Sequence, residues 1–225
     1  FSTEVLLGSN WEAHWKAIEM MRSNPVLGVN GLPMKAPVDE LGATALAHSG
    51  TGKGRNLYDS PSARESFRFG TLIATMLSPQ TKDAQTAEAF HRLQKLVSTS
   101  KVTGLAAEHC FIAPNLLECT LDDITQACTP VSFYKTKAKN IQLACERIVA
   151  NNYTTTTYYH ESSIDGGSNI TGKRIEESAG IPTDIQDLLS YKGVGPKIAY
   201  LTFSIAWRKD EGICVDTHVH RLANR

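Results

Sequence analysis

The chain has 225 residues, and its 23 basic side chains balance its 23 acidic ones, so its formal net charge is zero. Hydrophobic residues make up 41% of it and charged residues 20%, a composition typical of a globular protein with a buried core. No run of about 18 apolar residues occurs, which excludes a membrane-spanning helix, and we expect no membrane partner. A net charge of zero neither favours nor excludes binding to nucleic acid.

The start of the chain and its cysteines indicate whether it is a fragment and which redox compartment it occupies. The chain begins at Phe1 without an initiator Met or a signal peptide, so we expect an excised fragment. Its five cysteines are odd in number and include no Cys-x-x-Cys pair. This pattern argues against a disulfide framework or a zinc site and favours a reducing compartment.

Helical spacing dominates the first half of the chain. Trp11, Trp15 and Ile18 predict an N-terminal helix. Residues 42–61 are rich in Gly, Ser and Thr, and we expect a mobile surface loop there. A second helix is predicted by an apolar stripe at the spacing i, i+3, i+4, i+7 and i+8, formed by Phe69, Leu72, Ile73, Met76 and Leu77.

The second half of the chain is also predicted to be helical. The same apolar spacing recurs over residues 141–149. Residues 151–180 lack this periodicity, and we expect an exposed, flexible insertion. Thr183 and Gln186 have the spacing of a capping box at a helix start, and residues 198–207 are apolar enough for a buried helix. No alternating run predicts a strand, so the expected fold class is all-α.

A Gly-x-Gly segment, Gly193-Val194-Gly195, separates two of these helices. Pro196 follows it and suits the first turn of a helix, where the amide hydrogen that proline lacks would have no partner. Glycines permit a tight turn and let backbone N–H groups approach a ligand. With the positive end of the second helix, these groups would form an anion site for a DNA phosphate. The alternative is an ordinary corner between two helices.

Charges are unevenly distributed along the chain. Residues 131–147 contain four cations and one acid, and residues 189–225 contain six cations and three acids. Residues 108–123 carry acids only. A neutral chain with segregated charge can present a basic face to phosphate. Solvated helix faces are the simpler interpretation of each cluster.

Four motifs, in their order along the chain, resemble those of the endonuclease III family of helix-hairpin-helix DNA glycosylases. They are residues 76–83 (MLSPQTKD), residues 133–141 (FYKTKAKNI), residues 193–197 (GVGPK) and residues 215–225 (VDTHVHRLANR). Residues 36–39 (APVD) are similar to the eukaryotic branch, and the resemblance as a whole covers residues 67–225. The family usually has Leu-Pro before the hairpin, where this chain has Tyr191 and Lys192.

The resemblance implies that Lys197 is the Schiff-base lysine and Asp216 the catalytic aspartate. A lyase that cuts at a base-free sugar needs an amine to attack C1′. The positive end of a helix and desolvation under DNA both disfavour the ammonium form of such an amine. The carboxylate could accept a proton or stabilise positive charge that develops on the sugar. Two simpler roles stay open: Lys197 as a phosphate contact, and Asp216 as the N-cap of a helix predicted over residues 217–224.

The resemblance also implies a set of DNA-binding residues. Gln80 would fill the hole that a flipped base leaves in the duplex, although a glutamine at a helix end can simply face water. His218 would contact a phosphate, and Lys192 adds a charge that attracts phosphate. The predicted DNA-binding residues are Gln80, Lys192, Gly193, Val194, Gly195 and His218. His218 and His220 are too few for a metal site, which needs three or four ligands.

The expected organisation is a helical barrel or bundle with a helix-hairpin-helix motif and an incomplete second helical lobe. Residues 1–60 would form the N-terminal segment of the second lobe with a mobile loop, and residues 61–207 the barrel domain. Residues 208–225 would return into the second lobe and end before that lobe is complete. Family members continue into helices with four cysteines for a [4Fe–4S] cluster. No cysteines here have that spacing, so we expect no cofactor in this chain and a cluster only if the protein continues past Arg225.

The sequence thus predicts a bifunctional base-excision-repair N-glycosylase and AP lyase that removes oxidised pyrimidines from duplex DNA. The expected partner is double-stranded DNA with a damaged base or an abasic site, bound by a monomer in the nucleus or the mitochondrion. The alternatives are a helix-hairpin-helix module that binds DNA without chemistry, and a monofunctional glycosylase that uses activated water. Lys197 favours the bifunctional enzyme, because adenine-specific relatives generally lack a lysine at this hairpin position.

Overall fold

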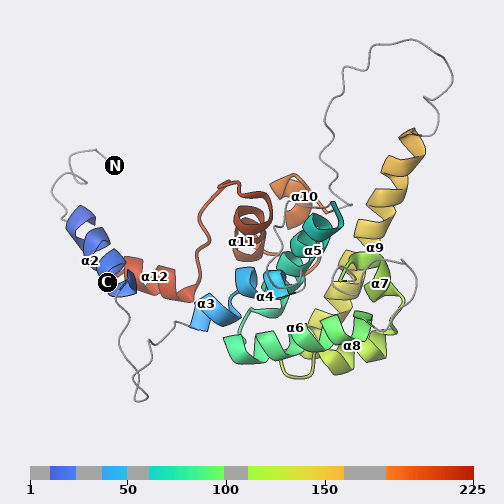
Figure 1. Ribbon diagram of the computed structural model, residues 1–225, viewed down its shortest axis with the longest axis horizontal. Coiled ribbons are helices and arrows are strands. Elements are labelled where there is room, and N and C mark those ends of the chain that lie inside the picture. The colour runs from blue at the N-terminus through green and yellow to red at the C-terminus, as the bar shows by residue number, and fades with distance from the viewer. Residues whose placement is uncertain (1–10, 24–36, 50–60, 99–110, 160–180) are drawn as a thin grey trace, which may run out of the picture. The chain divides into compact units, whose positions relative to one another are not determined.

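The computed structural model describes residues 11–23, 37–49, 61–98, 111–159 and 181–225. These residues form helices joined by turns, with no strand among them, which confirms the all-α prediction (Figure 1). In this described part, no helix is both long and apolar enough to cross a membrane. The chain divides into two compact units, Phe1–Glu40 and Leu41–Arg225.

The first unit contains the predicted N-terminal helix. This helix is α2 (Trp11–Ser23), and the short helix α3 (Pro37–Leu41) follows it. Trp15 Nε1 donates a hydrogen bond to Glu19 Oε1 over 2.8 Å, one turn further along α2. The apolar residues that predicted α2, Trp11, Trp15 and Ile18, are all exposed. Their spacing therefore predicted the helix correctly, but they do not form a core.

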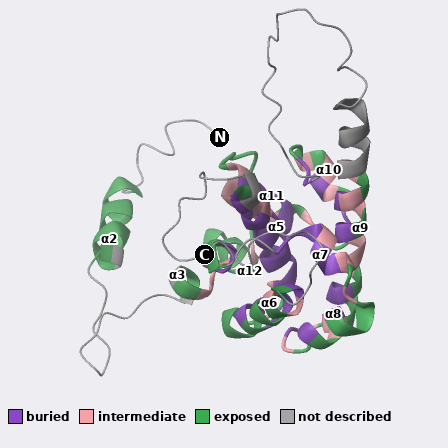
Figure 2. Cartoon of the chain, turned by 45° about the vertical axis from the view of Figure 1, so that its right-hand side comes forward, coloured by how far each residue is buried: buried purple, intermediate pink, exposed green. Residues whose placement is uncertain are grey.

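The second unit has its core around α5 (Pro61–Leu77). Two helices pack against it, α4 (Ala43–Ser49) and α11 (Pro196–Trp207). Thr75 Oγ1 and Thr202 Oγ1 lie 2.8 Å apart in a buried hydrogen bond that joins α5 to α11. Figure 2 shows α5 largely in the colour of buried residues. The predicted stripe of α5 is confirmed as part of this core: Phe69, Leu72, Ile73, Met76 and Leu77 are all buried.

Helix α4 corrects the loop that the sequence predicted over residues 42–61. Residues 43–49 are helical, and Leu46 and Ala47 are buried against the core. The segment contains three alanines and a leucine, which favour the helix, and burial of Leu46 offsets the entropy lost on ordering. The first compact unit ends at Glu40, and the predicted N-terminal segment over residues 1–60 stays a prediction. Residues 50–60 lie outside the described residues.

Four further helices pack beside this core: α6 (Asp83–Ser98), α7 (Ala113–Leu117), α8 (Leu121–Ala127) and α9 (Tyr134–Tyr159). The helices α7 and α8 pack against α9, and α6 packs against α8. The ring of Phe111 connects α5 to α6, because its centroid lies 5.2 Å from that of Phe69 and 5.1 Å from that of Phe90. The predicted stripe of α9 is confirmed, since Ile141, Ala144, Cys145 and Ile148 are buried.

The predicted insertion over residues 151–180 begins as helix. α9 continues to Tyr159, because extending a formed helix needs only one more residue to be ordered for each hydrogen bond gained. Residues 160–180 lie outside the described residues, so the prediction of a flexible insertion is untested there. The next helix, α10 (Ile185–Leu189), is capped by Asp184 rather than by Thr183. The carboxylate of Asp184 accepts hydrogen bonds from the backbone N–H groups of residues 186 and 187.

Candidate functional site

The Gly-x-Gly segment forms a tight turn between α10 and α11, as predicted. Gly193 has a φ of +84°, the left-handed region that side chains disfavour. A Cβ at Gly193 would lie 2.4 Å from Nδ2 of Asn140 on α9, so the Asn140 side chain would have to move to admit it. The turn is closed by Val194 N–H, which donates to the carbonyl of Tyr191 over 3.0 Å. The left-handed conformation is therefore the main reason for glycine at this position, and the contact with Asn140 adds to it.

The other two residues of the turn have different functions. Val194 is buried and anchors the turn in the core. Gly195 is the N-cap of α11 with a φ of −96°, and a Cβ built there would meet nothing within 4 Å. Pro196 occupies the first turn, as predicted. The N-terminus of α11 therefore begins beside open space, where its positive end favours an anion.

Tyr191 and Lys192, just before the turn, stand where the endonuclease III family usually has Leu-Pro. Tyr191 is buried, and the Arg147 guanidinium carbon lies 4.6 Å from its ring centroid. Arg147 also pairs with Asp187 on α10 at 2.6 Å, so it connects α9 to the helix that enters the turn. Burial, with the nearby Asp187 carboxylate, raises the pKa of Tyr191 above its usual range. Lys192 is exposed, which leaves its charge beside the turn in solvent.

Asp216 begins α12 (Thr217–Ala223) and caps it, as the sequence predicted. Its Oδ1 atom accepts hydrogen bonds from the backbone N–H groups of His218 at 2.9 Å and Val219 at 2.8 Å. These bonds, that of Val219 foremost, hold the pKa of Asp216 below its usual range, and the charge of Lys197 acts in the same direction. The structure therefore brings Lys197, in the first turn of α11, within electrostatic reach of an ionised carboxylate.

His218 and Cys214 also lie around this pair. His218 is exposed at the start of α12. Cys214 is half-buried, and burial raises the pKa of its thiol; the charges of Lys197 and Asp216 act on it in opposite directions. No group of three or more metal-ligating side chains occurs among the described residues.

Gln80 is located on a different turn, between α5 and α6. It is exposed and has a φ of +54°, which is uncommon for a residue other than glycine. The turn is held by Thr81 N–H, which donates to the carbonyl of Ser78 over 3.1 Å. A residue in such a conformation at an exposed turn is often functional, because the surrounding structure has to stabilise it.

Two residues beside this turn have positions that the sequence did not predict, Phe133 and Lys137. Phe133 precedes α9 with a φ of +56° and 67% of its surface exposed, although phenylalanine is normally buried. The sequence signal for an exposed Phe133 was that it does not belong to the apolar stripe of α9. Lys137 was counted among the cations of a basic face, which is wrong. It is buried, 9% exposed, because its ammonium group bonds to the backbone of the Gln80 turn.

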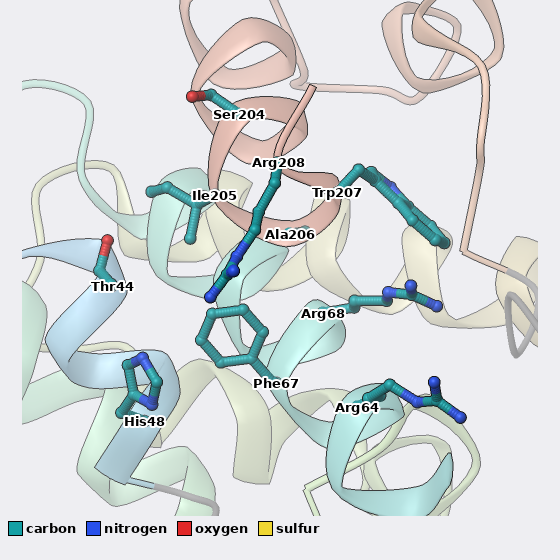
Figure 3. Close-up of a pocket in the computed structure, with 10 residues that line it drawn as sticks. All are labelled: Thr44, His48, Arg64, Phe67, Arg68, Ser204, Ile205, Ala206, Trp207 and Arg208. Atoms are coloured by element: carbon teal, nitrogen blue, oxygen red, sulfur yellow. The ribbon is translucent and has the colours of Figure 1, made fainter. Parts of the chain in front are cut away.

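The pocket in Figure 3 lies apart from these residues, at the opposite end of α11. Thr44 and His48 of α4, Arg64, Phe67 and Arg68 of α5, and residues 204–208 line it. The guanidinium carbon of Arg68 lies 3.6 Å from the Trp207 ring centroid. Burial lowers the pKa of His48, and the charge of Arg208 adds to the effect. Lys197 begins the same helix about ten residues earlier, roughly 15 Å along its axis, so this pocket is separate from the candidate site.

The described cysteines do not fit an iron–sulfur cluster. Cys119, Cys128, Cys145 and Cys214 are all free thiols. Burial raises the pKa of Cys128 to about 12 and that of Cys145 further, which disfavours the thiolate that binds iron. The [4Fe–4S] cluster accordingly stays a prediction for sequence outside this chain.

Known proteins are similar to this chain over most of its length. The model of the HhH-GPD superfamily base excision DNA repair proteins matches residues 73–225. Endonuclease III-like protein 1 of Mus musculus is 31% identical over 216 residues, which cover 96% of this chain and 53% of that protein. Endonuclease III homolog 1, chloroplastic, of Arabidopsis thaliana is 32% identical over 217 residues, 96% of this chain and 42% of that protein. The chain thus spans about half the length of the curated relatives it matches.

Solved structures are also similar. A trapped endonuclease III–DNA covalent intermediate matches with a TM-score of 0.47 and 21% identity, over 84% of this chain and 68% of that chain. A non-covalent endonuclease III–DNA complex matches with a TM-score of 0.46 over the same shares. It is the superfamily match and the relatives, rather than these structures, that confirm the resemblance to the endonuclease III family.

Proposed function

Because this chain belongs to the HhH-GPD superfamily of base excision DNA repair proteins, we propose that it is a bifunctional DNA glycosylase and AP lyase acting on oxidised pyrimidines in duplex DNA. One observation carries the lyase part of the proposal. Lys197 lies in the first turn of the helix that follows the hairpin, and its charge interacts with the ionised carboxylate of Asp216. A protein that only binds DNA would need no carboxylate beside the cation that contacts the phosphate.

In the proposed reaction, the neutral amine of Lys197 attacks C1′ of the damaged nucleotide. The bond from C1′ to the base breaks, and the base leaves with the bonding electrons and takes up a proton. The sugar ring opens to a Schiff base on Lys197 Nζ, and loss of a C2′ proton then expels the 3′ phosphate by β-elimination. Asp216 stabilises the positive charge that develops on the sugar and accepts a proton, because its lowered pKa keeps it ionised at neutral pH.

DNA binding is proposed to use both turns of the site. The open N-terminus of α11 at Gly195, with Lys192 and His218, would bind phosphates and hold the backbone in register. Gln80 would fill the space of the extruded base and contact the orphan base opposite. Phe133, an exposed ring on a turn linked to that of Gln80, would wedge between base pairs at the same place.

Borohydride trapping tests the proposal directly. A duplex with an oxidised pyrimidine or an abasic site should give a covalent adduct with the full chain, because borohydride reduces a Schiff base to a stable amine. Lys197→Gln should abolish both the adduct and strand cleavage. The same variant should keep most DNA affinity, since it removes one cation among several.

Each alternative function gives a different result. Base release without an adduct would indicate a monofunctional glycosylase, and binding without release would indicate a DNA-binding module. Cleavage by Lys197→Gln at the wild-type rate would place the nucleophile elsewhere.

A DNA repair protein acts in a compartment that contains DNA, so we propose the nucleus or a DNA-containing organelle as its location. We also propose that its active form is a monomer.

A further inference from the structure

The ammonium group of Lys137 has a complete set of partners at the end of α5. Its Nζ donates to the carbonyl of Leu77 at 2.6 Å, to the carbonyl of Pro79 at 2.8 Å and to Thr81 Oγ1 at 2.9 Å. A lysine ammonium has three protons, so each proton has an acceptor. All three acceptors belong to the turn that carries Gln80.

Helix geometry explains why this turn needs a cation. Leu77 ends α5, so its carbonyl has lost the partner that a further helical turn would supply. Pro79 has no amide hydrogen and cannot extend the helix. The negative end of the helix dipole favours a positive charge at this point. Lys137 thus supplies the hydrogen bonds and the charge that the end of α5 lacks.

Lys137 also contacts the second turn. Its backbone N–H donates to the carbonyl of Phe133 over 3.0 Å in the first turn of α9. Thr81 Oγ1, which accepts from Lys137 Nζ, also accepts from the backbone N–H of Ser132 over 3.3 Å. The backbone bond is the ordinary first bond of α9 and would form with any residue at this position. The Lys137 side chain therefore holds the Gln80 turn directly and reaches the Phe133 turn through Thr81, which joins the two turns.

Both of the turns that Lys137 holds contain a residue with positive φ, +54° at Gln80 and +56° at Phe133. Such conformations persist only where neighbouring groups stabilise them. Burial lowers the pKa of Lys137 to about 8, with a smaller opposing effect from Cys128, so burial of this charge carries a free-energy penalty. A penalty of this kind is retained where the charge has a structural or functional role.

We propose that Lys137 is a positioning residue that holds Gln80 and Phe133 in the arrangement that enters the duplex. This inference rests on the proposed function. Preformed turns avoid the entropy of ordering on binding, so loss of the Lys137 ammonium should weaken recognition of a damaged site and leave the Schiff-base chemistry of Lys197 intact.

A double-mutant cycle on the full chain tests this inference. The probes are a duplex with an uncleavable abasic analogue, for affinity, and a single strand with a natural abasic site, for borohydride trapping. Lys137→Met keeps the length of the side chain and removes the ammonium. Lys95→Met, on the exposed part of α6, is the matched control for loss of one positive charge.

We expect Lys137→Met to weaken binding of the abasic duplex by about tenfold, the effect of having to order two side chains on binding, and Lys95→Met to weaken it far less. Trapping on the single strand, which has no hole to fill, should stay near the wild-type rate. Gln80→Ala with Lys137→Met should lose little more affinity than the weaker-binding single variant. Independent, additive losses of duplex affinity would overturn the inference, and so would a clear fall in the trapping rate of Lys137→Met on the single strand.

A second pair of variants covers a failure of Lys137→Met to fold. Thr81→Val removes the shared hydroxyl acceptor and Thr81→Ser keeps it, so only the valine variant should lose duplex affinity. Equal affinity of the two variants would count against the inference. If the wild-type chain gives no adduct on either probe, the proposed lyase function fails, while the affinity cycle still decides whether Lys137 acts through Gln80.

Discussion

The two oxygens of the Asp216 carboxylate differ in their hydrogen bonds. Oδ1 accepts both capping bonds of α12, and Oδ2 has no hydrogen bond to the described residues. The bonds from Val219 and His218 lower the pKa of Asp216 first of all, and Lys197 adds to the effect. A carboxylate that stays ionised and has a free oxygen suits the role of a general base or an electrostatic stabiliser.

Asp216→Asn separates the structural role from the chemical one. Asparagine caps helices about as well as aspartate, so thermal stability should stay close to that of the wild type. The rate of base removal under single-turnover conditions should fall by roughly 10²–10⁴-fold, as expected for loss of a positioned acid–base group. Circular dichroism melting and a glycosylase assay on the same preparation measure the two effects. An unchanged rate would restrict Asp216 to capping.

At the scale of elements, the hairpin depends on helices that are distant in sequence. Asn140 of α9 fills the space where a side chain at Gly193 would lie. Arg147, two turns further along α9, pairs with Asp187 of α10 and stacks over Tyr191. The helix α9 therefore sets both the entry into the hairpin and its conformation, which allows Tyr191 and Lys192 to replace the usual Leu-Pro.

The two hairpin glycines should respond differently to substitution. Gly193→Ala should destabilise the protein by at least about 1–2 kcal/mol, the cost of a left-handed conformation for a residue with a side chain, and Asn140 would also have to move. Gly195→Ala should change stability by no more than about 1 kcal/mol, because its φ is ordinary and its surroundings are open. It should instead weaken DNA binding, since the added methyl group occupies the proposed phosphate site.

Chemical denaturation of the two variants, alongside affinity for a plain duplex, measures both effects. Equal stability of Gly193→Ala and Gly195→Ala would show that the turn relaxes without penalty, and that the contact with Asn140 does not restrict it.

At the scale of the whole molecule, the buried core belongs to one unit. Every buried hydrophobic residue in the described part of the chain lies in Leu41–Arg225, beginning with Leu46. The apolar residues of α2 in Phe1–Glu40 are exposed. α12 also has no buried residue, although Asp216 at its start is part of the candidate site.

Removal of residues 1–40 should consequently leave the second unit folded. Residues 41–225 should melt in one cooperative transition, with a Tm within about 4 °C of the full chain, because the buried hydrophobic residues in the described part of the chain all belong to this unit. Calorimetry of both proteins measures the difference. A broad, non-cooperative transition would show that the first unit contributes to the core.

The sequence alone determined the features that depend on local pattern. The apolar periodicities of α5 and α9 predicted helices, and the apolar density of residues 198–207 predicted the buried α11, because a helix that buries one face must repeat its apolar residues every three to four positions. Asp216 was predicted as an N-cap and as a partner of Lys197. The structure confirms the cap, and the charge of Lys197 contributes to the lowered pKa of Asp216; the catalytic pairing of the two residues stays a prediction.

Only the tertiary structure decided the features that depend on residues far apart in the chain. Lys137 has the spacing and charge of a surface cation, and its burial follows from three acceptors more than fifty residues earlier. Residues 43–49 form a helix because α5 is there to bury Leu46. A side chain at Gly193 would displace Asn140, which packing brings from α9 against the hairpin. Local propensity contains no information about these partners, since each contact exists only after the helices have packed.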